Sequence, residues 1–291
     1  MARRPSTPAL VALVAGAALL GYWALRPAPP ERGEAGPGVQ PPASAPAAAP
    51  AAAAALTQAA ATEVSPVAQA TPSARLALVI DDWGYQSAPV ERLKGITFQV
   101  TTSILPNLRF SRAAAEASHA GGHEVILHCP MQSVRAVAKE RNTLTTDMTP
   151  DQARAALQAD WDSVPWLVGM NNHEGSKASA DRALMDVAAA FLKERGGFFL
   201  DSVTTARSAI PAAAKAAGVP WARRRVFLDN DQRPAAVEAQ LKAAVALALK
   251  NGDCIAIGHP HKNTLDVLER LAPGLASQGV TLVKVSELVH P

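Results

Sequence analysis

The stretch LALVIDDWG, residues 76–84, decides how the folded part of this chain is built. Its apolar run Leu76–Ile80 predicts a β-strand, and two adjacent carboxylates, Asp81 and Asp82, follow where that strand ends. Residues on a strand alternate between its two faces, but at its end the chain turns, so both carboxylates can address one site. Other strands that end in polar side chains of this kind would add groups to the same site.

Short apolar runs of this kind recur along the rest of the chain, separated by Ala-rich stretches that predict helices. The alternation of strand and helix predicts parallel strands with crossover helices, an α/β fold. The expected strands are Leu76–Ile80, Gln99–Ile104, Glu124–Leu127, Leu167–Met170, Gly197–Leu200, Arg225–Leu228, Ile255–Ile257 and Leu282–Val285.

Three of the expected helices carry start or stop signals. Thr149, followed by Pro150 and Gln152, has the pattern of an N-cap with a capping box. A second helix is expected to begin at Ser179 and end at Gly196. The third is expected to run from Pro234 to Gly252.

Both a doubly wound open sheet and a closed barrel fit this alternation, and the strand ends favour the barrel. In (β/α) barrels the active site forms from side chains at the carboxyl ends of several strands, whereas an open sheet concentrates them at one switch point. The residues that follow the expected strands are Asp81-Asp82, Pro106-Asn107, His128, Asn172-His173, Asp201, Asp229-Asn230, His259 and Ser286.

Three histidines among these strand ends, together with the aspartate pair, predict a metal site. A mononuclear catalytic zinc needs three nitrogen or oxygen ligands and an open position for water. His128, His173, His259, Asp81 and Asp82 offer enough groups for the ligands, for a base that takes a proton from water, and for an acid that protonates a leaving group.

At these residues the sequence resembles the divergent polysaccharide deacetylase family, a branch of the NodB-like carbohydrate esterases, from about Arg75 to Val289. The resemblance implies a distorted seven-stranded (β/α) barrel. The motifs that carry it, in the family's order, are LALVIDDWG at 76–84, GHEVILHCPM at 122–131, NNHEGS at 171–176, FFLDSVTT at 198–205, FLDN at 227–230 and IAIGHP at 255–260.

The resemblance also implies a role for each of the five strand-end residues. Asp81 corresponds to the general base, and His259 to the general acid. Asp82 and His128 correspond to metal ligands, with Zn²⁺ as the expected ion. The implied reaction is hydrolysis of an acetyl group on a polysaccharide.

Two departures from the family pattern bear on the metal. Gln132 stands where the usual His-x-x-x-His motif has its second histidine, so His173 is the expected replacement as third ligand. Glu174 stands where relatives show methionine, and it could cap Lys177 or intrude on the metal site. Asp201 and Asp229 are expected to orient the metal ligands rather than bind the metal directly.

The N-terminal quarter has a different composition and predicts no globular fold. Residues 1–26 hold an apolar run preceded by two arginines, which favours an uncleaved single-pass signal anchor over a cleaved signal peptide. Residues 27–74 are rich in Pro and Ala and predict a disordered linker. Residues 75–291 would then form the deacetylase-like domain, held in the bacterial periplasm by an inner-membrane anchor.

Composition excludes several other classes. With 28 Lys and Arg against 25 Asp and Glu, and no basic block, nucleic acid is not an expected partner. Two cysteines exclude a disulfide scaffold, and we expect Cys129 and Cys254 to be separate buried thiols.

Two other functions remain open. A non-catalytic glycan-binding or envelope-assembly module could keep the same barrel. Metal-dependent phosphoester hydrolysis would be expected to need further carboxylates and a phosphate-gripping arginine. The run Arg223–Arg225 could supply that charge, but it is read first as a solvated face preceding a strand.

Overall fold

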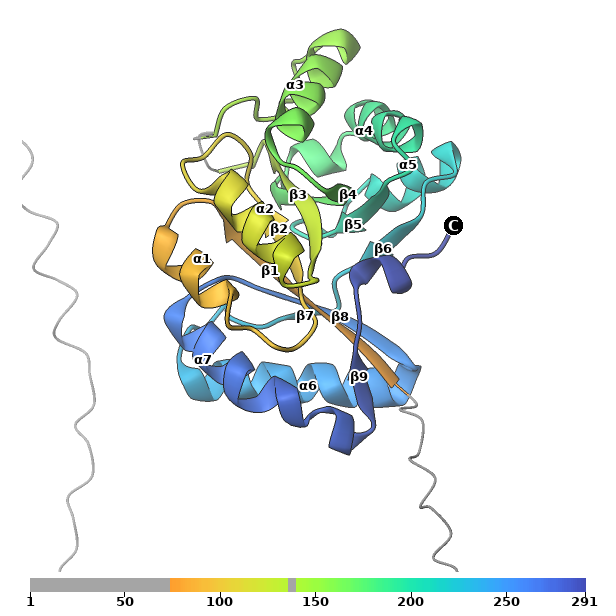
Figure 1. The fold of residues 1–291 in the computed structure, drawn as a ribbon. Helices are drawn as coiled ribbons and strands as arrows, with labels where there is room; N and C mark the ends of the chain where they lie inside the picture. The colour runs from red at the N-terminus through yellow and green to blue at the C-terminus, as the bar shows by residue number, and fades with distance from the viewer. Residues whose placement is uncertain (1–73, 136–139) are drawn as a thin grey trace, which may run out of the picture. The chain divides into compact units, whose positions relative to one another are not determined.

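The computed structural model describes residues 74–135 and 140–291, which form one parallel sheet with helices packed around it (Figure 1). The strands are β1 (Ala74–Trp83), β2 (Thr101–Ile104), β3 (Glu124–Met131), β4 (Leu167–Glu174), β5 (Phe198–Asp201), β6 (Trp221–Arg223), β7 (Val226–Phe227), β8 (Asp253–Gly258) and β9 (Val280–Leu282). The α-helices are α1 (Ser87–Leu93), α2 (Ser111–Ala120), α3 (Pro150–Ser163), α4 (Arg182–Glu194), α5 (Ile210–Ala217), α6 (Pro234–Asn251) and α7 (Lys262–Leu271).

The sheet runs in the order β6-β5-β4-β3-β2-β1-β8-β7, with β9 paired to the start of β1. Every ladder between named strands is parallel, and the two ends of the order, β6 and β7, do not pair with each other. The sheet is therefore a curled (β/α) barrel left open at one seam, and the predicted α/β fold with a distorted barrel is confirmed. The sequence does not predict β6, because three residues are too few to show a periodic pattern.

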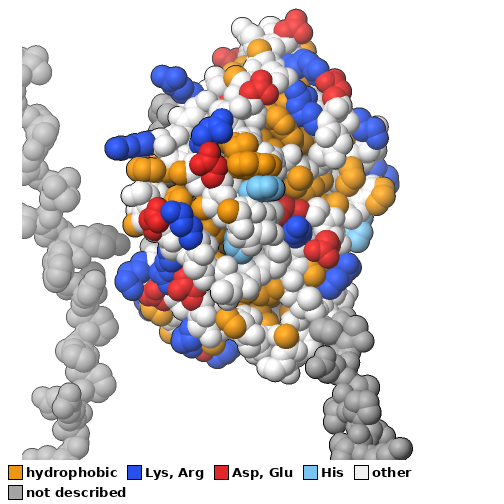
Figure 2. Space-filling view, viewed as in Figure 1, with side chains coloured by type: hydrophobic (Ala, Val, Ile, Leu, Met, Phe, Trp, Pro, Cys, Tyr) orange, Lys and Arg blue, Asp and Glu red, His pale blue; other side chains and the backbone are white. Residues whose placement is uncertain are grey.

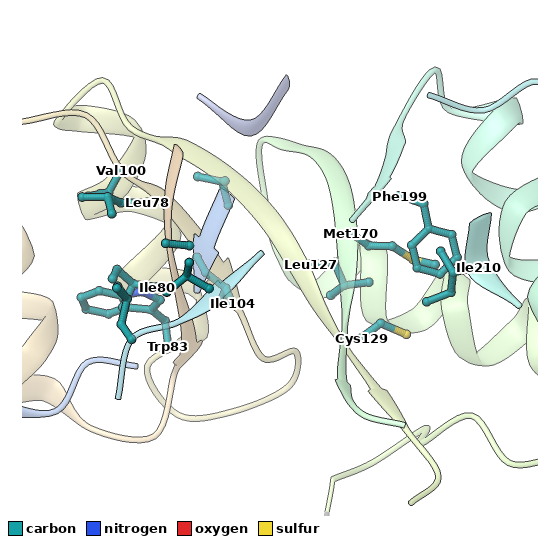
Figure 3. Packing of buried hydrophobic residues seen from close by; sticks show 14 of the residues in the cluster. Leu78, Ile80, Trp83, Val100, Ile104, Leu127, Cys129, Met170, Phe199 and Ile210 are labelled. Carbon is teal, nitrogen blue, oxygen red and sulfur yellow. The ribbon is translucent and has the colours of Figure 1, made fainter. Parts of the chain in front are cut away.

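Side chains of β1 alternate between two apolar layers. Leu78 and Ile80 pack toward the helices, in the larger core that also contains Trp83 and Leu127 (Figure 3). Ala77 and Val79 point to the inside of the curled sheet, where a smaller core fills the barrel. The strand is buried on both faces, as parallel strands covered by helices generally are. This alternation sets which strand-end residues face the inside of the barrel.

Two of the three predicted helix boundaries match the structure. The Thr149 hydroxyl accepts a hydrogen bond from the Gln152 amide, and the Gln152 side chain accepts one from the Thr149 amide, so the capping box is confirmed. Helix α6 begins at Pro234 and ends before Gly252, whose φ of 89° lies in the left-handed region that favours glycine.

The predicted start of α4 is wrong. Asp181, not Ser179, is its N-cap, and the Asp181 carboxylate accepts the Leu184 amide. Ser179 lies in a short 3₁₀ turn, where its hydroxyl donates to the Gly175 carbonyl. Ser179 lies within the 3₁₀ turn, whereas Asp181 has the extended backbone of an N-cap, and sequence alone does not distinguish these two uses.

The last strand and the residue after it also differ from expectation. Strand β9 ends at Leu282, and Val285–Glu287 forms a 3₁₀ turn instead of continuing the strand. The Ser286 amide contacts the carboxylate of Glu124, which begins β3 at the amino end of the sheet. Ser286 therefore lies at the opposite end from the predicted site.

Both cysteines are free and buried, as predicted. Cys129 packs on the helix side of the sheet with Met170 and Ile210 (Figure 3), one residue out of phase with His128. Burial raises the pKa of both thiols, that of Cys254 to about 11. Neither thiol is an activated nucleophile.

The predicted anchor and linker, residues 1–26 and 27–74, lie outside the described residues except for Ala74, which begins β1. Within the described ranges, no helix has both the length and the apolarity needed to cross a bilayer. On the face shown in Figure 2, acidic and basic side chains of the described part are interspersed.

Candidate metal centre and acid–base pair

The inner layer of the barrel places three of the predicted site residues at one end of the sheet. Asp81 continues the inward phase of Ala77 and Val79, and His128 continues that of Ile126. His259 likewise follows Ile255 and Ile257 in phase, one residue beyond β8. Because residues two apart on a strand share a face, the apolar filling of the barrel determines that these polar groups meet above it.

Asp82 would point to the helix side if β1 stayed regular, but the strand is irregular at this point. The register between β1 and β2 shifts between Ile80 and Trp83, and Asp82 has a φ of 60°. A non-glycine residue in the left-handed region is strained, and such strain is concentrated at functional sites. The distortion brings the Asp82 carboxylate to the same histidines as Asp81, as the sequence predicts for a strand end.

Three potential ligand atoms form a nearly equilateral triangle. Asp82 Oδ1 lies 3.2 Å from His128 Nε2 and 3.1 Å from His173 Nδ1, and these two nitrogens are 3.2 Å apart. Asp82 Oδ1 is buried and makes no hydrogen bond of acceptable geometry in the described structure, although both nitrogens are near. The three lone-pair-bearing atoms therefore face one another around a common point.

This triangle fits a divalent metal such as zinc. Zinc bonds of about 2.0–2.1 Å in tetrahedral geometry place neighbouring ligand atoms roughly 3.3 Å apart. The observed separations of 3.1–3.2 Å agree with that value. The donor set, one carboxylate and two imidazoles, leaves a fourth position for water, as catalytic zinc sites do. Asp82, His128 and His173 are thus the residues that would hold the ion.

Asn171, which the sequence prediction did not assign a role, orients two of the site residues. Its side-chain oxygen lies 2.7 Å from His128 Nδ1 and also accepts the Ser103 hydroxyl. Its side-chain nitrogen donates to Asp81 Oδ1 at 2.9 Å. A carbonyl oxygen can only accept, so His128 Nδ1 carries the proton and Nε2 keeps its lone pair for the metal. The one available signal was position, since Asn171 is in phase with His173 on β4.

The charges around the site favour a cation. Burial alone would lower the pKa of His128, but Asp81 and Asp82 outweigh it and raise that pKa to about 9. Burial would raise the pKa of Asp82, yet the two histidines hold it well below its usual range. Where no metal is bound, a proton on His128 therefore partly balances the two carboxylates. A divalent metal ion would take over that role.

The outer side of His173 is supported by a second carboxylate. His173 Nε2 lies 3.8 Å from Glu140 Oε1, and the Tyr85 hydroxyl donates to the same oxygen at 2.5 Å. At this distance the contact is electrostatic rather than a hydrogen bond, and it places a negative charge beside the ring nitrogen that lies outside the ligand triangle. Glu140 is far from His173 in sequence, and no motif indicated it.

His259 is held by a separate carboxylate, Asp229. Its Nδ1 lies 2.9 Å from Asp229 Oδ1, and its amide donates to Asp229 Oδ2 at 2.7 Å. Thr264 donates a third hydrogen bond to Asp229. His259 Nε2 faces the metal site, 3.9 Å from Asp82 Oδ2. Burial would lower the pKa of His259, but the bond to Asp229 and the nearby carboxylates raise it.

Several other predicted residues have different surroundings from those expected. Asp201 accepts the Val203 amide and pairs with Arg223, and it contacts none of the three candidate ligands. Asp229 does orient a site residue, but that residue is His259. Asn107 donates to Asp160 of α3 rather than entering the site.

Gln132 and Glu174, the two departures from the family pattern, take positions outside the ligand triangle. The Gln132 side chain accepts hydrogen bonds from the amide and hydroxyl of Thr146, so it stabilises the loop that contains Thr146. Glu174 is exposed, has a φ of 51° at the end of β4, and lines the hollow beside the site. His173 takes the third corner of the triangle.

A hollow of about 800 Å³ opens over these groups and gives a substrate access to them. It is lined by Asp81, Asp82, His128, His173 and His259, and its lining also includes Arg224, Arg225 and Phe227. A space of this size holds a few sugar rings or a comparable ligand.

Fold and site together define an α/β barrel protein with a carboxylate–histidine centre at the carboxyl ends of its strands. The chain belongs to the divergent polysaccharide deacetylase family, which it matches over residues 78–289. It is 36% identical over 216 residues to the uncharacterized protein YibQ of Escherichia coli K12, covering 74% of this chain and 67% of that protein. An uncharacterized protein of Haemophilus influenzae is 37% identical over 195 residues, covering 67% of this chain and 70% of its own length.

Among solved structures, the uncharacterized protein ATU2773 from Agrobacterium tumefaciens C58 superposes with a TM-score of 0.72 at 20% identity. The match covers 76% of this chain and 91% of that one. This likeness supports the fold. The reaction chemistry depends on the residues of the site.

Proposed function

We propose that this chain is a metal-dependent hydrolase that removes acetyl groups from an envelope or extracellular polysaccharide. The observation that carries the proposal is the triangle of Asp82 Oδ1, His128 Nε2 and His173 Nδ1, with a base and an acid on its borders. Membership of the deacetylase family supports the reaction class.

The metal, most simply Zn²⁺, would polarise the acetyl carbonyl and lower the pKa of a bound water. Asp81 would take a proton from the attacking water. Its Oδ1 is held by Asn171, and its Oδ2 lies 3.7 Å from His128 Nε2, beside the ligand triangle. Burial raises the pKa of Asp81, which brings the carboxylate nearer to the range of an effective general base.

His259 would protonate the leaving group. The Asp229 carboxylate accepts from Nδ1, so the other ring nitrogen, Nε2, carries the exchangeable proton toward the hollow. The raised pKa favours the protonated ring, and the departing amine or alkoxide would take the proton as the bond to the acetyl carbon breaks. Water and the acetylated sugar thus give acetate and the free amine or hydroxyl.

We also propose that residues 1–26 anchor the protein in the bacterial inner membrane and that residues 27–74 carry the catalytic domain into the periplasm. The apolar run, the arginines that precede it and the Pro/Ala-rich tract support this arrangement. A reporter fused after Pro291 should then be active only outside the cytoplasm.

The direct test is acetate release by the full chain from a panel of N-acetylated and O-acetylated glycans. The protein would be assayed as purified, after chelation, and after reloading with zinc. We expect activity that is lost on chelation, returns on reloading, and is lowered by about 10²–10⁴-fold in Asp81→Asn. A reloaded protein that binds glycans but releases no acetate from any of them would replace this proposal with the non-catalytic module.

A further inference from the structure

The arginine run Arg223–Arg225 lies at the open seam of the barrel, between β6 and β7 (Figure 1). The Arg224 amide donates to the Asp201 carbonyl and continues the ladder on the β5 side. The Arg225 amide donates to the Ile255 carbonyl and begins the ladder on the β8 side. The chain thus crosses from one end of the sheet to the other between these two arginines.

The three arginines have different surroundings. They therefore do not form the uniform solvent-exposed face that the sequence favoured. Arg223 pairs with the buried carboxylate of Asp201 at 3.1 Å. Arg224 and Arg225 both line the hollow over the metal centre and also the neighbouring hollow of about 530 Å³ at the seam. These two side chains therefore lie where the catalytic hollow meets the opening in the barrel wall.

Arg224 is fixed in place with donors to spare. Its Nε donates to the Ser202 carbonyl at 2.7 Å and its Nη2 to the Val203 carbonyl at 3.1 Å. Its guanidinium carbon lies 5.0 Å from the centre of the Phe227 ring, which itself packs edge-on against His259. In the described structure no atom accepts from Nη1, so a guanidinium already immobilised presents free N–H groups.

Arg225 adds a second positive charge at the same wall. It is exposed, and no carboxylate of the described residues lies within 4.0 Å of its guanidinium. With a divalent ion on Asp82 and the two histidines, the charges of the ion, Asp81 and Asp82 cancel. The arginines then outweigh Glu174, the remaining acidic residue of this lining, so an anionic ligand would be attracted to it.

We propose that Arg224 and Arg225 form a subsite for a carboxylate of the substrate, and that the preferred substrate is an acetylated glycan whose sugars carry carboxylates. Arginine binds carboxylates through paired N–H groups, and a preorganised guanidinium loses little entropy on doing so. This inference rests on the proposed deacetylase function and specifies the chemical class of the glycan.

The test compares substrates that differ only in charge. Acetate release would be measured on an O-acetylated polyuronate and on N-acetylated oligosaccharides that alternate hexosamine with uronic acid. Each would be paired with the same glycan after reduction of its carboxyl groups to primary alcohols. We expect the charged form to be favoured in kcat/KM by about tenfold, mainly through KM, and the preference to shrink as salt is raised.

Variants assign that preference to the two arginines. In the full-length holoenzyme, Arg225→Gln should reduce the ratio of kcat/KM between charged and reduced glycans by roughly three- to tenfold. Arg224→Lys keeps the charge but loses the fork and should reduce the same ratio. Arg112→Gln, which removes an exposed charge on α2 at a distance from the hollow, is the matched control and should leave the ratio unchanged.

The outcomes separate this inference from the function on which it rests. Equal rates on charged and reduced glycans would overturn the carboxylate subsite while leaving the deacetylase intact. A ratio that survives in both Arg225→Gln and Arg224→Lys would place the preference elsewhere and also overturn it. If no glycan releases acetate, the proposed function fails, and binding of the labelled charged and reduced oligosaccharides still tests the subsite through its dependence on Arg225.

Discussion

Two clusters of similar composition lie at the end of this barrel, and only one of them has the geometry of a metal site. Asp82, His128 and His173 form one, and Asp229, His259 and His261 form the other. In the first, the buried Asp82 Oδ1 has no hydrogen bond of acceptable geometry. In the second, Asp229 contacts His259 Nδ1 and accepts from the His259 amide and the Thr264 hydroxyl.

The difference teaches that residue type does not identify the metal ligands here. The Asp229 carboxylate already accepts hydrogen bonds from several donors, so it holds His259 in place. The Asp82 oxygen faces two ring nitrogens, and a bound cation would satisfy all three atoms. His261 strengthens this distinction, since its Nε2 is already in hydrogen-bond contact with the Gln232 side-chain nitrogen at 3.0 Å.

The largest expected effect is the loss of metal from the first cluster alone. Asp82→Ala, His128→Ala and His173→Ala should each remove most of the bound ion, because a site with three protein ligands tolerates no loss. His261→Ala is the matched control and should keep it. Elemental analysis of the purified full-length variants makes the comparison, and metal retained in His173→Ala would exclude that residue as the third ligand.

The second cluster should affect turnover without affecting metal content. Asp229→Asn removes the negative charge that raises the pKa of His259 and can place an amide donor against Nδ1, and His259→Gln removes the acid itself. Each should lower kcat by about 10²–10⁴-fold at an unchanged zinc content. Asp81→Asn should behave in the same way for the base. Loss of zinc from Asp229→Asn would contradict the division between the clusters.

Asn171 should produce a smaller effect that links the metal to the base. Asn171→Leu removes the acceptor for His128 Nδ1 and the donor to Asp81, so we expect metal affinity to fall by about 10–100-fold. Chelator competition at equilibrium measures this. Ser103→Ala, which removes only a second donor to the same oxygen, should cost less than Asn171→Leu, and equal affinities in all three proteins would show that Asn171 has no orienting role.

The remaining expected effect is on stability and lies outside both clusters. Asp160 is 1% exposed, and burial raises its pKa to about 7 although Asn142 and Asn107 donate to it. The folded protein therefore holds a proton that the unfolded chain, with a value near 3.8, has already lost. Stability should fall as pH rises from about 4 to about 7, by at most about 4 kcal/mol.

Asp160→Asn imitates the protonated side chain and should flatten this dependence. Chemical unfolding at pH 5 and pH 8 should show little difference between variant and parent at the lower pH and a more stable variant at the higher one. A variant that is less stable at pH 8 would show that the ionised carboxylate is preferred by its asparagine partners.

The sequence predicts a site residue most directly where its strand is regular. Asp81, His128 and His259 each follow an apolar run in phase, so an alternating pattern is enough to bring them to one end of the barrel. Asp82 required the chain to turn at the strand end, and its strained φ of 60° realises that turn. Ser286 was misplaced because β9 is shorter than its apolar run, and no local signal marks where the ladder stops.

By itself, the sequence determined the parallel (β/α) architecture, most strand positions, the buried thiols and the choice of chemistry-bearing residues. These follow from local hydrophobic pattern, turn chemistry and the family's motifs. Only the tertiary structure decided how the strained end of β1 turns Asp82 toward two ring nitrogens, that Asn171 and Glu140 contact the ligand histidines, and that Arg224 and Arg225 line the catalytic hollow. Those relations join residues far apart in the chain, and they depend on register, strain at a strand end and the place where the barrel stays open.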